Sequence, residues 1–136
     1  METTLIILKP DAIQRRLTGR IIARFEDKGF QIVGMKLARL PEATLRAHYA
    51  AHQGKPFYEP LVRYMSSQPV LLLAVRAKNA IAIARAMMGK TFGCDAAPGT
   101  IRGDYAVSNR FNLIHGSDSP EAAAKEISLF FGPGEI

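Results

Sequence analysis

Short apolar runs along the chain predict four strands. Residues 3–8 and 70–75 are continuous aliphatic runs, which are typical of strands buried on both faces of a sheet. Residues 30–40 alternate between apolar and polar positions, and residues 113–114 form a brief apolar step before a histidine. The pattern therefore indicates a sheet of four strands.

Periodic apolar positions between these runs predict helices. The helical segments are residues 19–28, 41–51, 57–65, 80–88 and 120–132. Thr18, Asn79 and Ser119 stand where a polar side chain caps a helix N-terminus. Gly29 and Gly89 stand where a glycine ends a helix. The sequence therefore supplies both start and stop signals for these helices.

The order of the elements favours an α+β fold. Strand, helix, strand, two helices, strand, helix, loop, strand and helix follow one another, which predicts helices covering a four-stranded sheet. We expect the loop over residues 91–104, with three glycines and Pro98, to be functional because of its length. A chain of 136 residues is sufficient for one hydrophobic core, so residues 1–136 are expected to form one domain.

Composition narrows the class of protein. Hydrophobic residues make up 48% of the chain, and no apolar run approaches the roughly 20 residues that cross a bilayer, so no membrane role is expected. The start of the chain lacks the pattern of a signal peptide. The single cysteine, Cys94, excludes an intrachain disulfide and fits a reducing cytoplasm, where we expect the protein.

The net charge of +6 favours anionic partners. Nucleotides and nucleic acids both qualify as partners of a basic protein. The 18 Lys and Arg residues are scattered, and Arg15-Arg16 is the only adjacent pair. We therefore do not expect nucleic acid to be the main partner.

The segment from Asn112 to Ser119 carries the strongest chemical signal. His115 ends an apolar run, and a glycine, hydroxyls, a carboxylate and a helix start follow it. A histidine after an apolar pair is more often structural, but Gly116 removes bulk beside the ring and the helix start favours an anion. A nucleophilic imidazole needs a hydrogen bond at its second nitrogen, for which Ser117 and Glu126 are candidates. The pattern predicts phosphoryl transfer through a phosphohistidine.

This octet resembles the active-site segment of the nucleoside diphosphate kinases. Further matches follow in the family's order: residues 7–11 (Ile-Leu-Lys-Pro-Asp), residues 24–30, His48-Tyr49, Lys55-Pro56-Phe57, residues 98–104 and residues 125–127. The resemblance covers nearly the whole chain, and several separated motifs in order are more specific than one. It implies a ferredoxin-like α+β fold with a four-stranded antiparallel sheet. It also implies ping-pong transfer of the γ-phosphate, typically from ATP, to a nucleoside diphosphate, with broad base and sugar tolerance.

The resemblance implies roles for individual residues. The phosphates would lie among Lys9, Tyr49, Arg85, Thr91 and Arg102, and the sugar would contact Lys9 and Asn112. Phe57 would stack on the base, and Leu61 would line the same slot. His115 would carry the phosphoryl group on its pros nitrogen, held by Glu126 and Ser117. Mg²⁺ would be bound mainly by the nucleotide phosphates, with Asp118 the nearest carboxylate, through water. The family assembles as hexamers or tetramers built from dimers.

Two departures from the family concern the nucleotide site and the assembly. Asn109 stands where many members have an apolar residue that closes the base slot, which predicts a more polar slot. Phe92-Gly93 follows Thr91 where many members have a proline in the long loop, and that loop contributes to subunit contacts.

Other interpretations of the sequence are weaker. Gly89-Lys90-Thr91 resembles the end of a phosphate-binding loop, but position 84 is alanine and a helix precedes the motif. His48 and His52 have a helical spacing that suits zinc, but no third ligand accompanies them, so we expect surface histidines. A non-catalytic nucleotide or nucleic-acid binding module is the alternative function, because fold alone does not establish activity.

Overall fold

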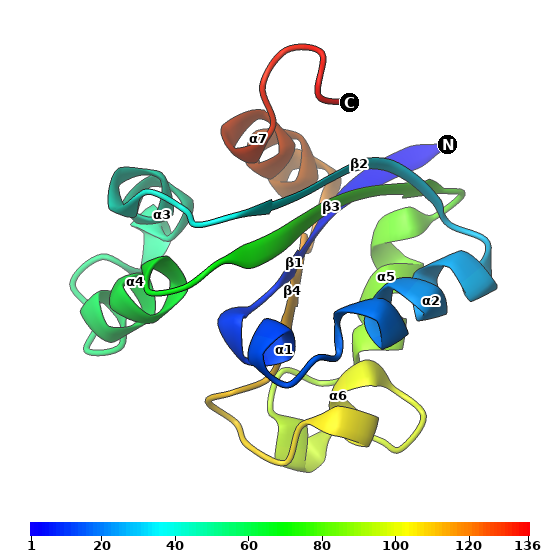
Figure 1. The fold of residues 1–136 in the computed structure, drawn as a ribbon, viewed down its shortest axis with the longest axis horizontal. Coiled ribbons are helices and arrows are strands. Elements are labelled where there is room, and N and C mark those ends of the chain that lie inside the picture. Colours follow the sequence, from blue (N-terminus) through cyan, green and yellow to red (C-terminus); the bar gives the residue numbers. More distant parts are fainter.

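A computed structural model describes residues 1–136 as a sheet covered by helices (Figure 1). The main elements are β1 (Glu2–Leu8), α1 (Pro10–Gln14), α2 (Thr18–Lys28), β2 (Gln31–Ala38), α3 (Glu42–His48), α4 (Tyr58–Ser66), β3 (Val70–Ala77), α5 (Ala80–Met88), α6 (Ile101–Tyr105), β4 (Ile114–Gly116) and α7 (Pro120–Phe130). Two 3₁₀ turns, Ala50–His52 and Gly93–Asp95, complete the chain. None of the helices has the length and apolar character that a bilayer crossing requires.

The four strands form one antiparallel sheet in the order β2-β3-β1-β4. The central strands β1 and β3 pair over their full length, from Glu2 opposite Ala77 to Leu8 opposite Leu71. The two edges differ: seven of the eight β2 residues pair with β3, with a bulge at Val33, whereas β4 is only three residues long. This topology confirms the predicted four-stranded, ferredoxin-like α+β fold.

Each face of the sheet has its own hydrophobic core, because side chains alternate along a strand. On β1, Ile6 and Leu8 pack in a cluster with α2, α5 and α6, whereas Leu5 and Ile7 pack in a cluster with α3, α4 and α7. Figure 1 shows these two groups of helices on opposite sides of the strands. The continuous apolar runs predicted as two-face-buried strands are therefore confirmed.

Helix boundaries correct some of the predictions. Pro10 does not only end a strand but begins α1, which suits its fixed φ at a first helical position. Thr18 lies inside α2, and the preceding Leu17 is the N-cap, so the prediction of a Thr18 cap is wrong. Asn79 is at an N-cap with φ of 57°, yet its side chain makes no capping bond. Ser119 accepts a hydrogen bond from the Ala122 amide, which confirms its cap.

Two segments differ from the predicted pattern: one helix is shorter than expected, and one expected loop contains a helix. The helix predicted through residue 51 stops at His48, and a separate 3₁₀ turn follows. The segment expected to be a loop from residue 91 to 104 contains α6 and a 3₁₀ turn. Thr100 begins α6 by accepting a hydrogen bond from the Gly103 amide. This short helix carries Arg102 into the core between the sheet and the loop.

Candidate functional site

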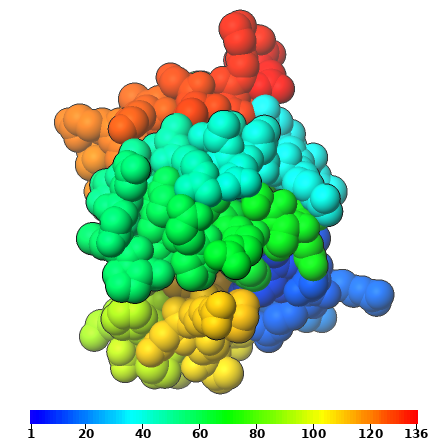
Figure 2. All heavy atoms as spheres, turned by 90° about the vertical axis from the view of Figure 1, so that its left-hand side faces the viewer, coloured from blue at the N-terminus to red at the C-terminus, as the bar shows by residue number.

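Two adjoining cavities form one groove at an end of the sheet. The larger has a volume of about 710 Å³ and the smaller about 310 Å³. Lys9, Thr91 and Asn112 line both, so the two spaces are continuous. The larger cavity lies between α4 and the segment after α5, which Figure 2 shows as green and yellow-to-gold surfaces. The groove therefore offers a wide compartment joined to a narrower one.

The wide compartment has the flat, apolar walls that suit an aromatic ring. Phe57, Pro60 and Leu61 form one wall from the start of α4, and Phe92 belongs to the opposite wall. Phe57 is 48% exposed, although a large apolar side chain of this size is usually buried. Asn109 lines the same space, and its Oδ1 accepts a hydrogen bond from the Cys94 thiol at 2.8 Å. The polar residue at position 109 is thus tied to the loop.

The narrow compartment collects positive charge. Lys9, Arg85 and Arg102 line it together. The Lys9 ammonium donates to the Asn112 side chain at 2.7 Å. Desolvation by burial, with the nearby Arg102 charge, lowers the pKa of Lys9 to about 8. Burial, followed by the Arg85 charge, lowers the pKa of Arg102 to about 10. Three cations that repel one another in one cavity favour an anionic ligand.

Arg102 has a structural task as well. Its guanidinium donates to the carbonyls of Asn112, Gly89 and Ile114. These bonds hold α6 against the start of β4 and the end of α5. Because an arginine has five N–H donors, the side chain still has donors for a ligand. Arg85 donates to the Gly116 carbonyl at 3.1 Å and so lies beside the histidine strand.

His115 lies on β4 at the inner end of the charged compartment. Its Nε2 is 3.2 Å from Oε1 of Glu126 on α7, and Ser117 donates to the same oxygen at 2.7 Å. Burial by itself would raise the pKa of Glu126, but the hydrogen bonds from His115 and Ser117 outweigh it and lower the pKa. An ionised carboxylate only accepts, so the proton of a neutral His115 ring sits on Nε2.

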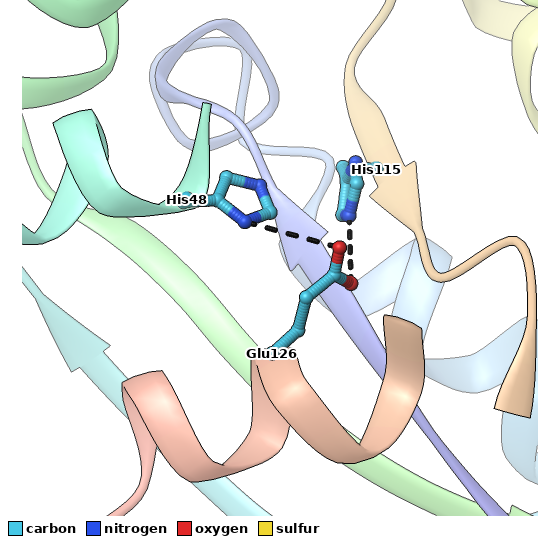
Figure 3. A group of neighbouring side chains, drawn as sticks. All are labelled: His48, His115 and Glu126. Carbon is cyan, nitrogen blue, oxygen red and sulfur yellow. Dashed lines mark hydrogen bonds and ion pairs between the residues drawn. The ribbon is translucent and has the colours of Figure 1, made fainter. Parts of the chain in front are cut away.

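The free nitrogen of His115 points away from Glu126. Figure 3 shows one ring nitrogen directed at the carboxylate and the other on the opposite side of the ring. With the proton held on Nε2, Nδ1 keeps its lone pair. The geometry therefore presents a nucleophile in a cavity that collects anions.

The backbone before His115 is held in an unusual conformation. Leu113 has φ of 72°, a left-handed value that is uncommon for a branched side chain. Its amide donates to Oδ2 of the buried Asp11 at 3.1 Å, and its carbonyl accepts from the Lys9 amide. Tyr64 from α4 donates to the other Asp11 oxygen at 2.7 Å. These contacts fix the turn that directs His115 into the groove.

The structure contradicts the expectation that His48 is a surface residue. Its side chain is only 3% exposed, and Nδ1 is 3.8 Å from Oε2 of Glu126. The His48 and His115 rings meet edge to face with centroids 5.0 Å apart. Burial, followed by the repulsion of His115, lowers the pKa of His48 to about 4. His52 lines the charged cavity instead of facing open solvent. Helical spacing could not show this, because α7 and β4 supply the surroundings.

Most of the predicted site residues meet in the groove. Lys9, Phe57, Leu61, Arg85, Thr91, Arg102, Asn112, His115, Asp118 and Glu126 line one or both cavities, and Ser117 contacts Glu126. Tyr49 lines neither cavity; it is buried against His48, with ring centroids 4.4 Å apart. Gly116 also packs closely against α5: a Cβ there would lie 2.6 Å from the Met88 sulfur, so that side chain would have to shift.

Sequence reasoning missed several residues of the groove. Asp11, Pro60, Tyr64, Arg110 and His48 all lie in or directly behind it. Asp11 had a signal, since a carboxylate directly after a buried strand is unusual, but its partner Tyr64 is 53 residues away. Only the packing of α4 against the sheet brings the pair together.

Comparisons with known proteins all point to one family. The family model described as nucleoside diphosphate kinase matches residues 2–136. A nucleoside diphosphate kinase from Pelotomaculum thermopropionicum is 52% identical over the whole chain and 91% of the relative. Another from Roseiflexus sp. (strain RS-1) is 54% identical with the same coverage. The structure of a halophilic nucleoside diphosphate kinase from Halobacterium salinarum in complex with CDP has a TM-score of 0.96 at 45% identity, covering 98% of this chain and 90% of that one.

Proposed function

The chain belongs to the nucleoside diphosphate kinase family, and from this membership we propose that His115 carries the phosphoryl group between two nucleotides. The activity is that of a transferase acting on nucleotides: it moves the γ-phosphate of a nucleoside triphosphate to a nucleoside diphosphate. The observation that supports the role of His115 is the hydrogen bond from its Nε2 to Glu126, which leaves Nδ1 free.

The proposed reaction has two in-line displacements. Nδ1 of His115 attacks the γ-phosphorus, the bond to the bridging oxygen breaks, and the nucleoside diphosphate leaves with that electron pair. A second nucleoside diphosphate then attacks the phosphohistidine through a terminal oxygen, and Nδ1 recovers its lone pair. Glu126 and Ser117 hold the ring, while Lys9, Arg85 and Arg102 balance the charge on the transferring group. Thr91 lines both compartments and suits contact with the phosphates, whereas Tyr49, expected beside them, lies buried against His48 and would act on them from behind this ring.

We propose that the base enters the wide compartment. Phe57 stacks on one face of the base and Leu61 lines the slot, and Lys9 with Asn112 contacts the sugar. Stacking accepts every base, which supports broad base tolerance. The typical donor is ATP. Asn109 offers a polar group beside the slot, but its oxygen is already bonded to Cys94.

Nucleoside diphosphate kinases use a divalent cation, and the groove fits Mg²⁺ bound to the nucleotide. Of the two carboxylates that line the narrow compartment, Glu126 is bonded to His115 and Ser117, whereas Asp118 makes no hydrogen bond and is exposed. Mg²⁺ prefers oxygen ligands and keeps several waters, so Asp118 suits contact through water while phosphates supply the other ligands. The ion would neutralise charge on the β- and γ-phosphates.

We further propose a homo-oligomer, either a hexamer or a tetramer, built from dimers. Strand β2 is a full-length edge of the sheet, and Met35 and Leu37 on it are 56% and 61% exposed. An exposed apolar edge strand favours pairing with a second copy. Light scattering after size exclusion should give several chains per particle, and Leu37→Lys should lower that number. A monomeric wild type would contradict the proposal.

The cytoplasmic location stays a prediction.

A labelling experiment tests the phosphohistidine. Protein mixed with Mg²⁺ and γ-labelled ATP, quenched without acid, should keep the label on the chain. The label should be acid-labile, should pass to GDP on chase, and should be absent in His115→Ala. An unlabelled wild-type chain that still binds nucleotide would overturn the proposal and favour a binding module.

A further inference from the structure

The three histidines of this chain gather at one place. His48 comes from α3, His115 from β4 and His52 from the 3₁₀ turn after α3, and the last two line the charged cavity. Nδ1 of His48 and Nε2 of His115 each face one oxygen of the Glu126 carboxylate, as Figure 3 shows. One ring nitrogen each from His48 and His115 and one carboxylate oxygen of Glu126 all lie within 4.8 Å of one another.

We propose that His48, His115 and Glu126 form a binding site for Zn²⁺ or a similar transition-metal ion, and that the bound metal inhibits phosphoryl transfer to His115. Two imidazoles and one carboxylate are a known donor set for zinc with an open fourth position. Imidazole nitrogen selects such ions over Mg²⁺, which prefers oxygen. The binding part stands on geometry alone; the inhibitory part rests on the proposed role of His115.

The distances are close to those of a metal-bound site. In a tetrahedral zinc site, neighbouring ligand atoms are separated by about 3.3 Å. Nε2 of His115 is already 3.2 Å from Oε1 of Glu126, and Nδ1 of His48 is 3.8 Å from the other carboxylate oxygen, Oε2. The longest separation, within 4.8 Å, must shorten by no more than about 1.5 Å, which side-chain rotation supplies.

The surroundings also resemble those of a metal ligand set. Only 3% of the His48 side chain is exposed, so a metal ion on its Nδ1 would be shielded from water on that side. Ser117 donates to Glu126 and would orient the carboxylate toward a bound ion, as outer hydrogen bonds do in metal sites.

Metal binding would remove the nucleophile. A metal on Nε2 of His115 takes the place of the proton that now forms the hydrogen bond to Glu126. The neutral ring then carries its proton on Nδ1, which has no lone pair left for phosphorus. The same atoms that make His115 reactive would therefore make it a ligand, and the two states exclude each other.

Metal titration of the nucleotide-free protein tests the binding part. The measurements use a Cys94→Ser background, because Cys94 is exposed and its thiol would compete for the metal. Calorimetry with Zn²⁺ should give one ion per chain, and Co²⁺ should give the visible bands of a tetrahedral site. His48→Gln should weaken Zn²⁺ binding at least tenfold, whereas His52→Gln, a matched loss of a neighbouring histidine, should change it less than threefold. Equal affinity in wild type and His48→Gln, or equal losses in both variants, would overturn the site.

Nitrogen-15 spectra of the histidine rings provide a second readout on the unaltered histidines. Added Zn²⁺ should move the Nδ1 signal of His48 and the Nε2 signal of His115, and signals that stay in place would overturn the site. Zn²⁺ at saturation should also lower phosphohistidine labelling at least tenfold; unchanged labelling of a zinc-bound chain would overturn the inhibition. If the chain is not labelled even without zinc, the proposed function is contradicted. The metal titration still tests the binding site in that case.

Discussion

His115 depends on the hydrogen bond that fixes its proton. Glu126 accepts from both His115 and Ser117, and α7 carries it to the site from eleven residues further along the chain. Asp11 holds the left-handed turn at Leu113, two residues before the ring. The reactive state of one side chain therefore rests on two carboxylates with separate tasks: Glu126 sets the tautomer and Asp11 holds the backbone.

Glu126→Gln tests the first task. An amide can donate as well as accept, so it no longer fixes the proton of His115 on Nε2. We expect the turnover rate to fall roughly 10- to 100-fold, with a smaller change in nucleotide affinity. Glu121→Gln, an exposed carboxylate in the first turn of the same helix, is the matched control and should keep the wild-type rate. Steady-state kinetics compare the two, and equal rates would contradict the role of Glu126.

The loss of the Lys9 charge at high pH predicts that nucleotide binding weakens as the pH rises. Its pKa of about 8 means that the ammonium loses its proton as the pH rises above 8, and the attraction for phosphate is lost with it. The dissociation constant of ADP should rise roughly five- to tenfold between pH 7.5 and 9. Calorimetric titration at several pH values measures this change. Lys9→Met should bind weakly at every pH, and a pH-independent wild type would contradict the assignment.

The element that most affects the charged compartment is α6, a helix of five residues. Thr100 caps it and donates to the Ala97 carbonyl at 2.6 Å, so the turn before the helix is closed on itself. Arg102 projects from it to three carbonyls on other elements. A short helix has little stability of its own, and these tertiary bonds hold it in place.

Gly103→Ala tests how tightly α6 fits. A Cβ at this position would overlap the Ala97 carbonyl, so the turn must open. We expect the free energy of unfolding to fall by about 1–3 kcal/mol, with weaker nucleotide binding as Arg102 shifts. Gly19→Ala is the matched control in α2, where nothing lies within 4 Å of the new methyl group. It should raise the free energy of unfolding by about 0.5–1 kcal/mol. Denaturant titration measures both, and equal effects would contradict the argument.

At the scale of the whole molecule, the charged site lies between the two hydrophobic cores. α3, α7 and the residue before α4 supply His48, Glu126 and Phe57, and α5 and α6 supply Arg85 and Arg102. The groove lies where these two halves meet at an end of the sheet. Buried titratable groups between the halves link the stability of the fold to the state of the site.

The burial of His48 predicts that the folded protein loses stability in acid. Its folded pKa of about 4 lies below the ordinary 6.5, because burial and His115 oppose its charge. The unfolded chain therefore binds more protons between these values, and the free energy of unfolding falls as the pH drops from 6.5 to 4. The fall is at most about 3 kcal/mol. Urea titrations across this range measure it. His48→Gln should have a shallower pH dependence, and identical slopes would contradict the argument.

Local patterns of residues are sufficient to predict the strands, most of the helices and the family. Apolar periodicity is local, so the buried runs of β1 and β3 and the Ser119 cap could be read directly from neighbouring residues. The short helix α6 could not, because contacts far along the chain stabilise it. The sequence places His48 at the surface for the same reason, because Glu126 and Phe130, which cover it, lie on the distant helix α7. Local patterns specify elements, whereas the proton position on His115 and the cluster around Glu126 exist only once distant elements pack together.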